Sequence, residues 1–192
     1  MSSKEPKIMW GEGTPWKSQA EFYTYLRGCL RQAWMRHPNK IKLLNAKRYK
    51  ADRLDKDGKV MLDKKTGLPK QVWHCSCEVC GYTGGMKDFQ VDHIHAAKNL
   101  QCFDDIPMFV LRLIYVNVED LRMVCKSCNS ILAYADKQGI SFEQAKVEKE
   151  AIAICKDKQD KKWLTKRGIE PASTVAKRRE QIVKILLQEI ES

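Results

Sequence analysis

The stretch VDHIH, residues 91–95, lies between two C-x-x-C pairs, CEVC at 77–80 and CKSC at 125–128, and Asn129 directly follows the second pair. Aspartate and asparagine offer oxygen ligands that suit hard metal ions, whereas paired cysteines offer thiolates that suit softer ones. The region therefore combines two kinds of potential metal site. We expect the fold of this chain to be organised around it.

The two cysteine pairs predict one zinc site. Cys77, Cys80, Cys125 and Cys128 can converge on a single tetrahedral zinc ion, because a long spacer only has to return the second pair to the first. Cys75 could compete with Cys77, but its spacing to Cys80 is wider than the usual gap. A site of four cysteines is closed, so this zinc is expected to be structural.

The VDHIH stretch also suggests catalysis. Asp92 and the side-chain carbonyl of Asn129 are hard ligands that could hold Mg²⁺ or Mn²⁺ and leave positions open for water and a phosphate. If the segment is extended, His93 points away from Asp92 and could act as a general base on the attacking water. His95 shares a face with His93 and could orient substrate, assist a proton transfer or be structural.

The charge distribution favours a polyanionic partner, most simply nucleic acid. The 192-residue chain carries 35 basic and 24 acidic residues, for a net charge of +11. Residues 1–72 hold 17 basic and 7 acidic residues, residues 73–137 hold 6 and 8, and residues 138–192 hold 12 and 9. Basic arms thus flank a slightly acidic centre. Eight basic residues are expected to contact DNA phosphates, unless they form only solvated faces. They are Arg27, Arg31, Lys47, Arg48, Lys50, Lys177, Arg178 and Arg179.

Membrane insertion and secretion are not expected. The sequence has no apolar run long enough to span a bilayer, and its N-terminus lacks the pattern of a secretory signal. The cysteine spacing fits a reducing compartment with bound zinc better than it fits an oxidising compartment with disulfides. We therefore expect a soluble cytoplasmic protein without a membrane partner.

Periodicity predicts an α+β chain with helical arms. Ser18 and Glu21 form a potential capping box for a helix that ends before Pro38, and residues 39–53 predict a second short helix. Turn signals at 57–58 and 66–69 predict a small hairpin. The remaining expected elements are a ribbon of 72–74 with 89–91, a helix at 106–115, a strand at 121–124, and helices at 129–136, 141–162 and 175–190.

Three parts follow from these elements. They are a basic, mainly helical N-terminal arm at 1–71, a core with structural zinc at 72–137, and a helical C-terminal arm at 138–192.

Three motifs resemble the zinc-bearing HNH endonucleases, whose core is a ββα-metal fold: CEVC at 77–80, VDHI at 91–94, and LRMVCKSCN at 121–129. The resemblance covers residues 72–137, and the flanks are similar to those of small bacteriophage-encoded members. It implies that Asp92 and Asn129 hold one catalytic divalent metal, that His93 activates water, and that the four cysteines bind structural zinc. A phage-encoded protein would act in the host cytoplasm.

One position departs from the family pattern. Asp120 precedes Leu121 where the family usually has a structural Asn that braces the loop after the catalytic His. Asp120 or nearby Asn117 would have to substitute, or the insertion at 96–118 would provide the bracing differently.

Two functions therefore compete at the level of sequence. The first is a metal-dependent DNA endonuclease that nicks or cuts duplex DNA; with one site per chain, a monomer would nick. The second is a zinc-stabilised DNA-binding or regulatory module with an idle nuclease site, which Asp120 favours. A third, a zinc-only packing protein, leaves the basic arms unused. The sequence sets neither the DNA specificity nor the oligomeric state.

Overall fold

The computed structural model describes residues 8–95 and 99–191, and the chain forms two compact units, Met1–Lys126 and Ser127–Ser192. The fold is mixed α+β, with helices and two small antiparallel sheets. The described part of the N-terminal arm and the strands of the expected core share the first unit, and the division into three parts stays a prediction. Residues 96–98, the start of the expected insertion, and the first seven residues of the arm lie outside the described residues.

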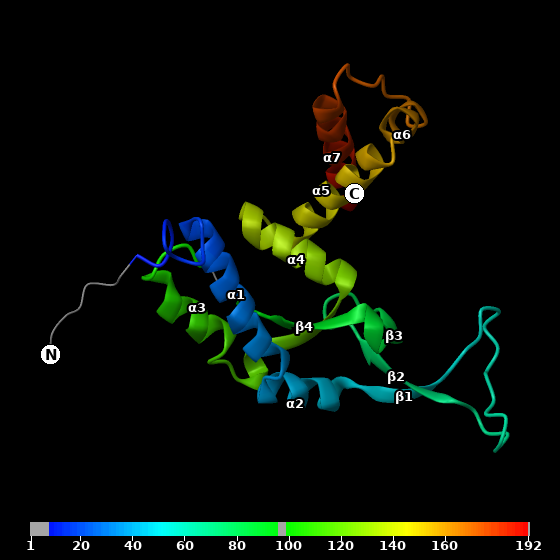
Figure 1. Ribbon diagram of the computed structural model, residues 1–192. Helices are drawn as coiled ribbons and strands as arrows, with labels where there is room; N and C mark the ends of the chain where they lie inside the picture. Colours follow the sequence, from blue (N-terminus) through cyan, green and yellow to red (C-terminus); the bar gives the residue numbers. More distant parts are fainter. Residues whose placement is uncertain (1–7, 96–98, 192) are drawn as a thin grey trace, which may run out of the picture. The chain divides into compact units, whose positions relative to one another are not determined.

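The first unit contains three α-helices, five strands and two short 3-10 helices within its described residues (Figure 1). In chain order they are α1 (Gln19–Met35), α2 (Pro38–Lys47), β1 (Tyr49–Asp52), β2 (Gln71–Ser76), β3 (Thr83–Gly85), η1 (Met86–Asp88), β4 (Phe89–His93), α3 (Asp105–Leu113), η2 (Val118–Asp120) and β5 (Leu121–Cys125).

The strands pair differently from the expected ribbon. β2 pairs with β1 on one side and with β3 on the other, whereas β4 pairs with β5. The prediction that 72–74 pairs with 89–91 is therefore wrong. The turn after β2 returns the chain at Gly81, which has a φ of 72°, and β3 then takes the free edge of β2.

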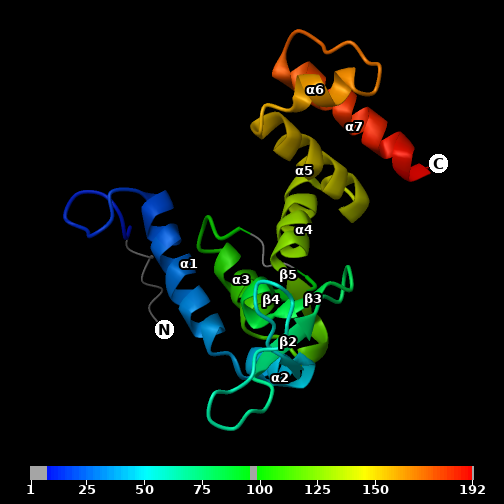
Figure 2. The same cartoon turned by 90° about the vertical axis from the view of Figure 1, so that its right-hand side faces the viewer.

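The helix α1 builds the main core of this unit with α3. Ser18 caps α1 by accepting a hydrogen bond from the backbone N–H of Glu21, as expected. Phe22 and Tyr23 are buried against Leu100 and the apolar side of α3, and Figures 1 and 2 both show α1 beside α3. Trp34, four residues after Leu30, packs at the edge of this core and continues the helical stripe.

The expected second helix ends early. α2 stops at Lys47, and residues 49–52 form β1, because pairing with β2 supplies the backbone hydrogen bonds that a longer helix would have made. Leu43 is the buried residue of α2, whereas Ile41 is 47% exposed. The loop from 53 to 70 joins β1 to β2, and its two turns have Gly58 and Gly67 at positive φ.

The second unit is helical. Its elements are α4 (Lys126–Gln138), α5 (Phe142–Lys156), α6 (Asp160–Thr165) and α7 (Val175–Glu191). Ser141 caps α5 and Thr174 accepts the backbone N–H of Lys177 in α7, as expected. The predicted helix 141–162 is interrupted after Lys156, where Lys158 has a φ of 56°, so α6 is a separate helix. Val147, Leu164 and Ile182 form the centre of a core shared by α5, α6 and α7.

Among the described residues, no helix is long and apolar enough to cross a membrane.

Candidate metal centre and candidate active site

Four cysteines form a compact cluster. The sulfur atoms of Cys77, Cys80, Cys125 and Cys128 all lie within 4.8 Å of one another. The first two lie in the turn after β2, Cys125 ends β5, and Cys128 lies in the first turn of α4. The Sγ atoms of Cys80 and Cys125 are 3.9 Å apart, close to the ~3.8 Å edge of a tetrahedron with zinc–sulfur bonds of about 2.3 Å.

The backbone around Cys77 favours its thiolate form. Burial raises the pKa of this thiol, but hydrogen bonds from the backbone N–H groups of Cys125, Cys80 and Val79 outweigh burial and lower the pKa to about 6. The N–H of Cys125 lies 3.3 Å from the Cys77 sulfur. A thiolate is the form that binds a metal, so the donor set suits zinc or a similar soft ion.

The other cysteines lie outside the cluster. Cys75 is fully buried, burial raises its pKa, and its thiol lies 3.1 Å from the sulfur of Met86, so it does not replace Cys77. Cys29 is exposed on α1. Cys102 and Cys155 are half-buried.

Asp92 lies opposite Arg122 in the β4–β5 ladder, and the two side chains form an ion pair. The Nε and Nη2 atoms of Arg122 both donate to Oδ2 of Asp92, at 3.0 and 2.9 Å. Because both bonds use Oδ2, an ion could bind through Oδ1 without breaking the pair. Sequence reasoning missed Arg122, which the correct β4–β5 register would have placed beside Asp92.

His93 is oriented by a backbone carbonyl. Its Nε2 lies 3.1 Å from the carbonyl oxygen of Leu113, and its ring lies 4.2 Å from the ring of Trp34, measured between centroids. A carbonyl oxygen can only accept, so Nε2 carries the proton, and in the neutral ring Nδ1 is the basic nitrogen. Burial lowers the pKa of His93, although the bond to Leu113 and the charge of Asp92 act in the opposite direction.

The turn before β5 braces the segment that follows His93. Asn117 and Asp120 form a reciprocal capping box around η2, in which Oδ2 of Asp120 accepts the backbone N–H of Asn117 at 2.8 Å. The carbonyl of Asp120 accepts the N–H of Ile94 at 2.9 Å. Asn117 and Asp120 therefore fix this turn, while their substitution for the asparagine of the HNH pattern stays a prediction.

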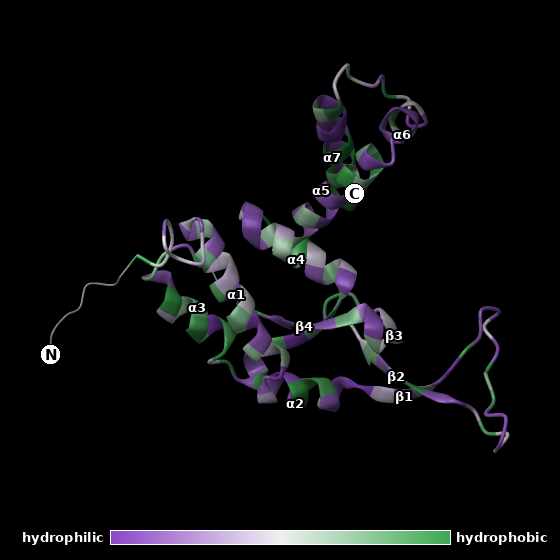
Figure 3. Ribbon diagram, viewed as in Figure 1, coloured by the Kyte–Doolittle hydropathy of each residue, from purple (hydrophilic) through white to green (hydrophobic). Residues whose placement is uncertain are grey.

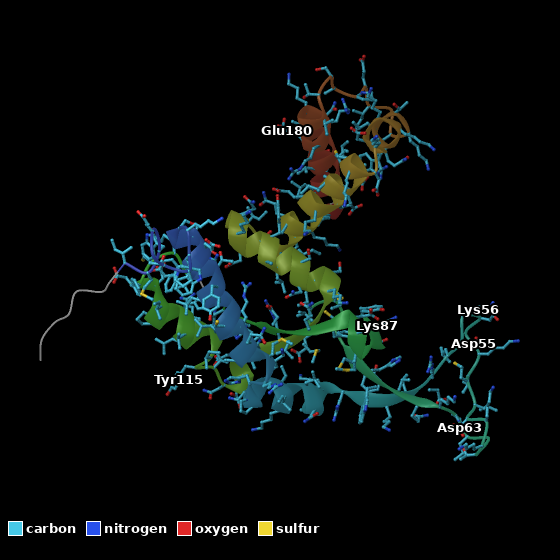
Figure 4. The ribbon with its side chains drawn as sticks, in the orientation of Figure 1. Asp55, Lys56, Asp63, Lys87, Tyr115 and Glu180 are labelled. Carbon is cyan, nitrogen blue, oxygen red and sulfur yellow. The ribbon has the colours of Figure 1, made fainter. Side chains whose placement is uncertain are left out.

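A cavity of about 260 Å³ lies beside the two histidines of the VDHIH stretch. His93 and His95 line it together with Arg112, Tyr115 and Asp120. Tyr115 is 83% exposed, and Figure 4 shows its side chain at the surface of the unit. The structure thus brings His95 to the same cavity as His93. Sequence reasoning predicted a helix over Arg112 and Tyr115 but did not single out either residue for a site.

Asn129 follows Cys128 in the first turn of α4 and is half-buried. The joint binding of one divalent ion by Asp92 and Asn129 stays a prediction.

The basic residues expected to contact DNA differ in their surroundings. Arg31 on α1 and Lys177 in the first turn of α7 are exposed. Arg27 is half-buried, and its guanidinium donates to the carbonyl of Leu100 at 3.1 Å.

A second group lies where α2 passes into β1. Lys47 pairs with Glu78, while Arg48 and Lys50 lie over the ring of Trp73, with Arg48 Cζ at 4.3 Å and Lys50 Nζ at 5.0 Å from its centroid. The side chain of Lys50 remains exposed.

Arg178 does not fit its expected role. It is 6% exposed and donates to Asp160 at 2.7 Å and to the carbonyl of Ala172 at 2.8 Å, so it stabilises the second unit instead of meeting a phosphate. Arg179 donates to the hydroxyl of Tyr134 at 3.1 Å and remains partly accessible.

Comparisons with known protein families, with curated proteins and with solved structures found no match. The fold and the cluster define an α+β protein with a four-cysteine centre that could hold a metal ion such as zinc.

Proposed function

We propose that this protein is a metal-dependent DNA endonuclease of the HNH type, with a structural zinc held by the four cysteines. The observation that carries the proposal is the setting of His93: it ends β4 next to Asp92, its Nε2 is held by the carbonyl of Leu113, and it lines a cavity. The order β4, β5, α4 is the ββα order that the resemblance implies.

Each residue has a distinct role in this proposal. Asp92 and Asn129 would hold Mg²⁺ or Mn²⁺, which when bound stabilises negative charge developing on the scissile phosphate. His93 accepts a proton at Nδ1 from a water molecule, the water oxygen bonds to phosphorus, and the bond from phosphorus to the leaving sugar oxygen breaks. Trp34 and Leu113 hold the imidazole in place during this step.

The test is cleavage of supercoiled plasmid in Mg²⁺ or Mn²⁺. Wild type should convert plasmid to nicked circles or linear DNA, and His93→Ala should lose at least about a hundredfold in rate because it removes the base. His74→Ala is the matched control, since His74 lies in β2 beside Tyr49 and should leave cleavage unchanged. Equal cleavage by His93→Ala and wild type, with zinc content preserved, would refute the assigned role.

One observation favours the alternative of a DNA-binding module with an idle site. The guanidinium of Arg122 neutralises Asp92, so the carboxylate already has a cationic partner. Tight binding of duplex DNA without cleavage in any divalent metal would support this second function.

A further inference from the structure

The strand β1, the loop that follows it and the first half of β2 form a basic hairpin, which we call the finger and define as residues 48–73. It contains eight Lys and Arg residues against four Asp. Figure 1 shows it extending away from the helices and strands of its unit, and Figure 3 shows hydrophilic stretches along it with hydrophobic positions between them. A projecting element with this charge is suited to a polyanion.

Backbone hydrogen bonds order the finger. At its base, the N–H of Arg53 donates to the carbonyl of Lys70 at 2.7 Å, and the N–H groups of Met61 and Lys70 donate to the carbonyls of Arg53 and Met61, both at 2.8 Å. These bonds divide residues 53–70 into two tight turns. The finger is thus held in a defined shape by hydrogen bonds within itself.

Two of the three aspartates in the turns, Asp55 and Asp63, accept hydrogen bonds from the backbone of their own turn. Oδ1 of Asp55 accepts the N–H groups of Asp57 and Lys59, both at 2.9 Å, and Oδ1 of Asp63 accepts that of Lys65 at 2.9 Å. The backbone hydrogen bonds that Asp63 accepts lower its pKa. Figure 4 shows Asp55 with Lys56 in one turn and Asp63 in the other.

The lysines of these turns carry exposed side chains. They are Lys56, Lys59, Lys64 and Lys65. The turns therefore fold around their aspartates and present their lysines to solvent.

Where β1 pairs with β2, Arg48 and Lys50 add positive charge to one face of the finger. Lys50 lies directly opposite Trp73 in the β1–β2 ladder, and Arg48 stacks on the same ring. Such cation–π contacts hold long basic side chains in defined positions and reduce the entropy lost when they bind.

Exposed apolar side chains lie between the lysines and arginines of the finger. Leu54, Leu62 and Leu68 are 56%, 56% and 65% exposed. Apolar contacts of this kind can meet the methyl group of thymine in a DNA groove.

We infer that the finger is a DNA-contact element that enters the major groove of duplex DNA. Residues 50–52 and 71–73 of the finger pair as a two-stranded antiparallel ribbon. The major groove, about 12 Å wide in B-form DNA, admits such a ribbon, whereas the major groove of an RNA duplex is deep and narrow. The inference rests on the proposed function in one respect, because the duplex held by the finger is the substrate of the candidate nuclease.

The experiment compares two variants with the same reduction in charge. The finger variant carries Lys56→Gln, Lys59→Gln, Lys64→Gln and Lys65→Gln, and the control carries Lys156→Gln, Lys161→Gln, Lys162→Gln and Lys166→Gln; all eight lysines are exposed. Binding to a labelled duplex is measured by fluorescence anisotropy over a range of salt concentrations without added divalent metal. Plasmid cleavage is measured separately, and circular dichroism with zinc content checks folding.

The finger variant should bind at least about tenfold more weakly than wild type. Its slope of log K against log salt should also become shallower by about 0.9 for each phosphate that the variant no longer neutralises, while the affinity of the control changes less than about threefold. If binding weakens equally in the two variants while wild type still cleaves plasmid, the finger is not a DNA-contact element, but the proposed nuclease function stands. Selective weakening in the finger variant, with no cleavage by wild type, would support the finger and overturn the nuclease.

Two other outcomes also decide the inference. Failure of wild type to bind duplex DNA would overturn the finger and the proposed function together. A larger effect of the finger variant on binding of duplex RNA or single strands than on duplex DNA would refute the major groove of DNA as its target.

Discussion

At the scale of single residues, backbone hydrogen bonds prepare Cys77 for a metal ion. These bonds lower its pKa to about 6 and so favour the thiolate, which is the form that binds a metal ion. The other three sulfurs of the cluster lie within 4.8 Å, where they could complete the same site. The cysteine spacing predicted this cluster because a C-x-x-C turn fixes its two thiols locally, whereas nothing in the sequence marked Arg178 as buried.

Replacing one cluster cysteine should release the metal. We expect Cys128→Ser to lose bound zinc, measured by mass spectrometry of metal content, and to lower the free energy of unfolding by several kcal/mol, because binding of structural zinc stabilises the folded state. Cys29→Ser is the control, since Cys29 is exposed outside the cluster and should leave both quantities unchanged. Unchanged metal content in Cys128→Ser would show that the cluster is not a metal site.

The buried pair of Asp160 and Arg178 predicts an acid sensitivity. The hydrogen bond from Arg178 is the main cause that lowers the pKa of Asp160 below its ordinary value, although burial opposes it. A group with a lowered folded pKa contributes stability above its unfolded pKa of about 3.9 and loses it as pH falls through the folded pKa.

Replacing that carboxylate should therefore cost stability at neutral pH. Asp160→Asn should lose about 3–5 kcal/mol at neutral pH, because Arg178 is left buried without its partner, and acidification below about pH 4 should destabilise it less than wild type. Urea unfolding across pH measures both effects. Glu189→Gln, which alters the exposed pair with Arg167, should change stability little, and an equal cost in the two variants would contradict the account.

At the scale of elements, the sequence predicted where helices begin better than it predicted which strands pair. Periodicity and caps predicted α1, α5 and α7 closely at their N-termini, because these signals are local. The pairing of β4 with β5 was missed because strand partners are distant in the chain, and with it the ion pair of Asp92 and Arg122. The loss of residues 49–52 from the second expected helix has the same cause, pairing with β2.

This cross-strand pair predicts a change in metal affinity. Removing a positive charge beside Asp92 removes its repulsion of a cation, so Arg122→Gln should bind Mn²⁺ at least about fivefold more tightly. Titration calorimetry on zinc-loaded protein measures the affinity, with Arg36→Gln, an exposed residue following α1, as a charge-matched control. Weaker Mn²⁺ binding by Arg122→Gln would show that Arg122 orients Asp92 for the ion instead of competing with it.

At the scale of the whole molecule, two cores are built separately. One joins α1 and α3 around Phe22, Tyr23 and Leu113, and the other joins α5, α6 and α7 around Leu164 and Ile182. Each unit therefore has its own apolar core. The three parts expected from the sequence were drawn from charge balance and predicted elements, whereas the two units follow core packing, so the three-part division stays a prediction.

Metal removal should consequently act locally. Chelation of zinc should speed amide hydrogen exchange in β4, β5 and the turn of Cys77 and Cys80, while α5 and α7 keep their protection, because their core contains no cluster cysteine. Hydrogen exchange followed by mass spectrometry distinguishes the two regions. Parallel loss of protection in both would show that the units unfold cooperatively.

The central claim is that His93 activates water for hydrolysis of DNA, and mapping of cleavage ends tests it most directly. A long duplex is incubated with wild type or His93→Ala in Mg²⁺ or Mn²⁺, and every new end is sequenced. We predict metal-dependent ends with wild type and none above background with His93→Ala, whose zinc content and fold are unchanged. Wild type without new ends in either metal, or the same ends from His93→Ala, would contradict the claim.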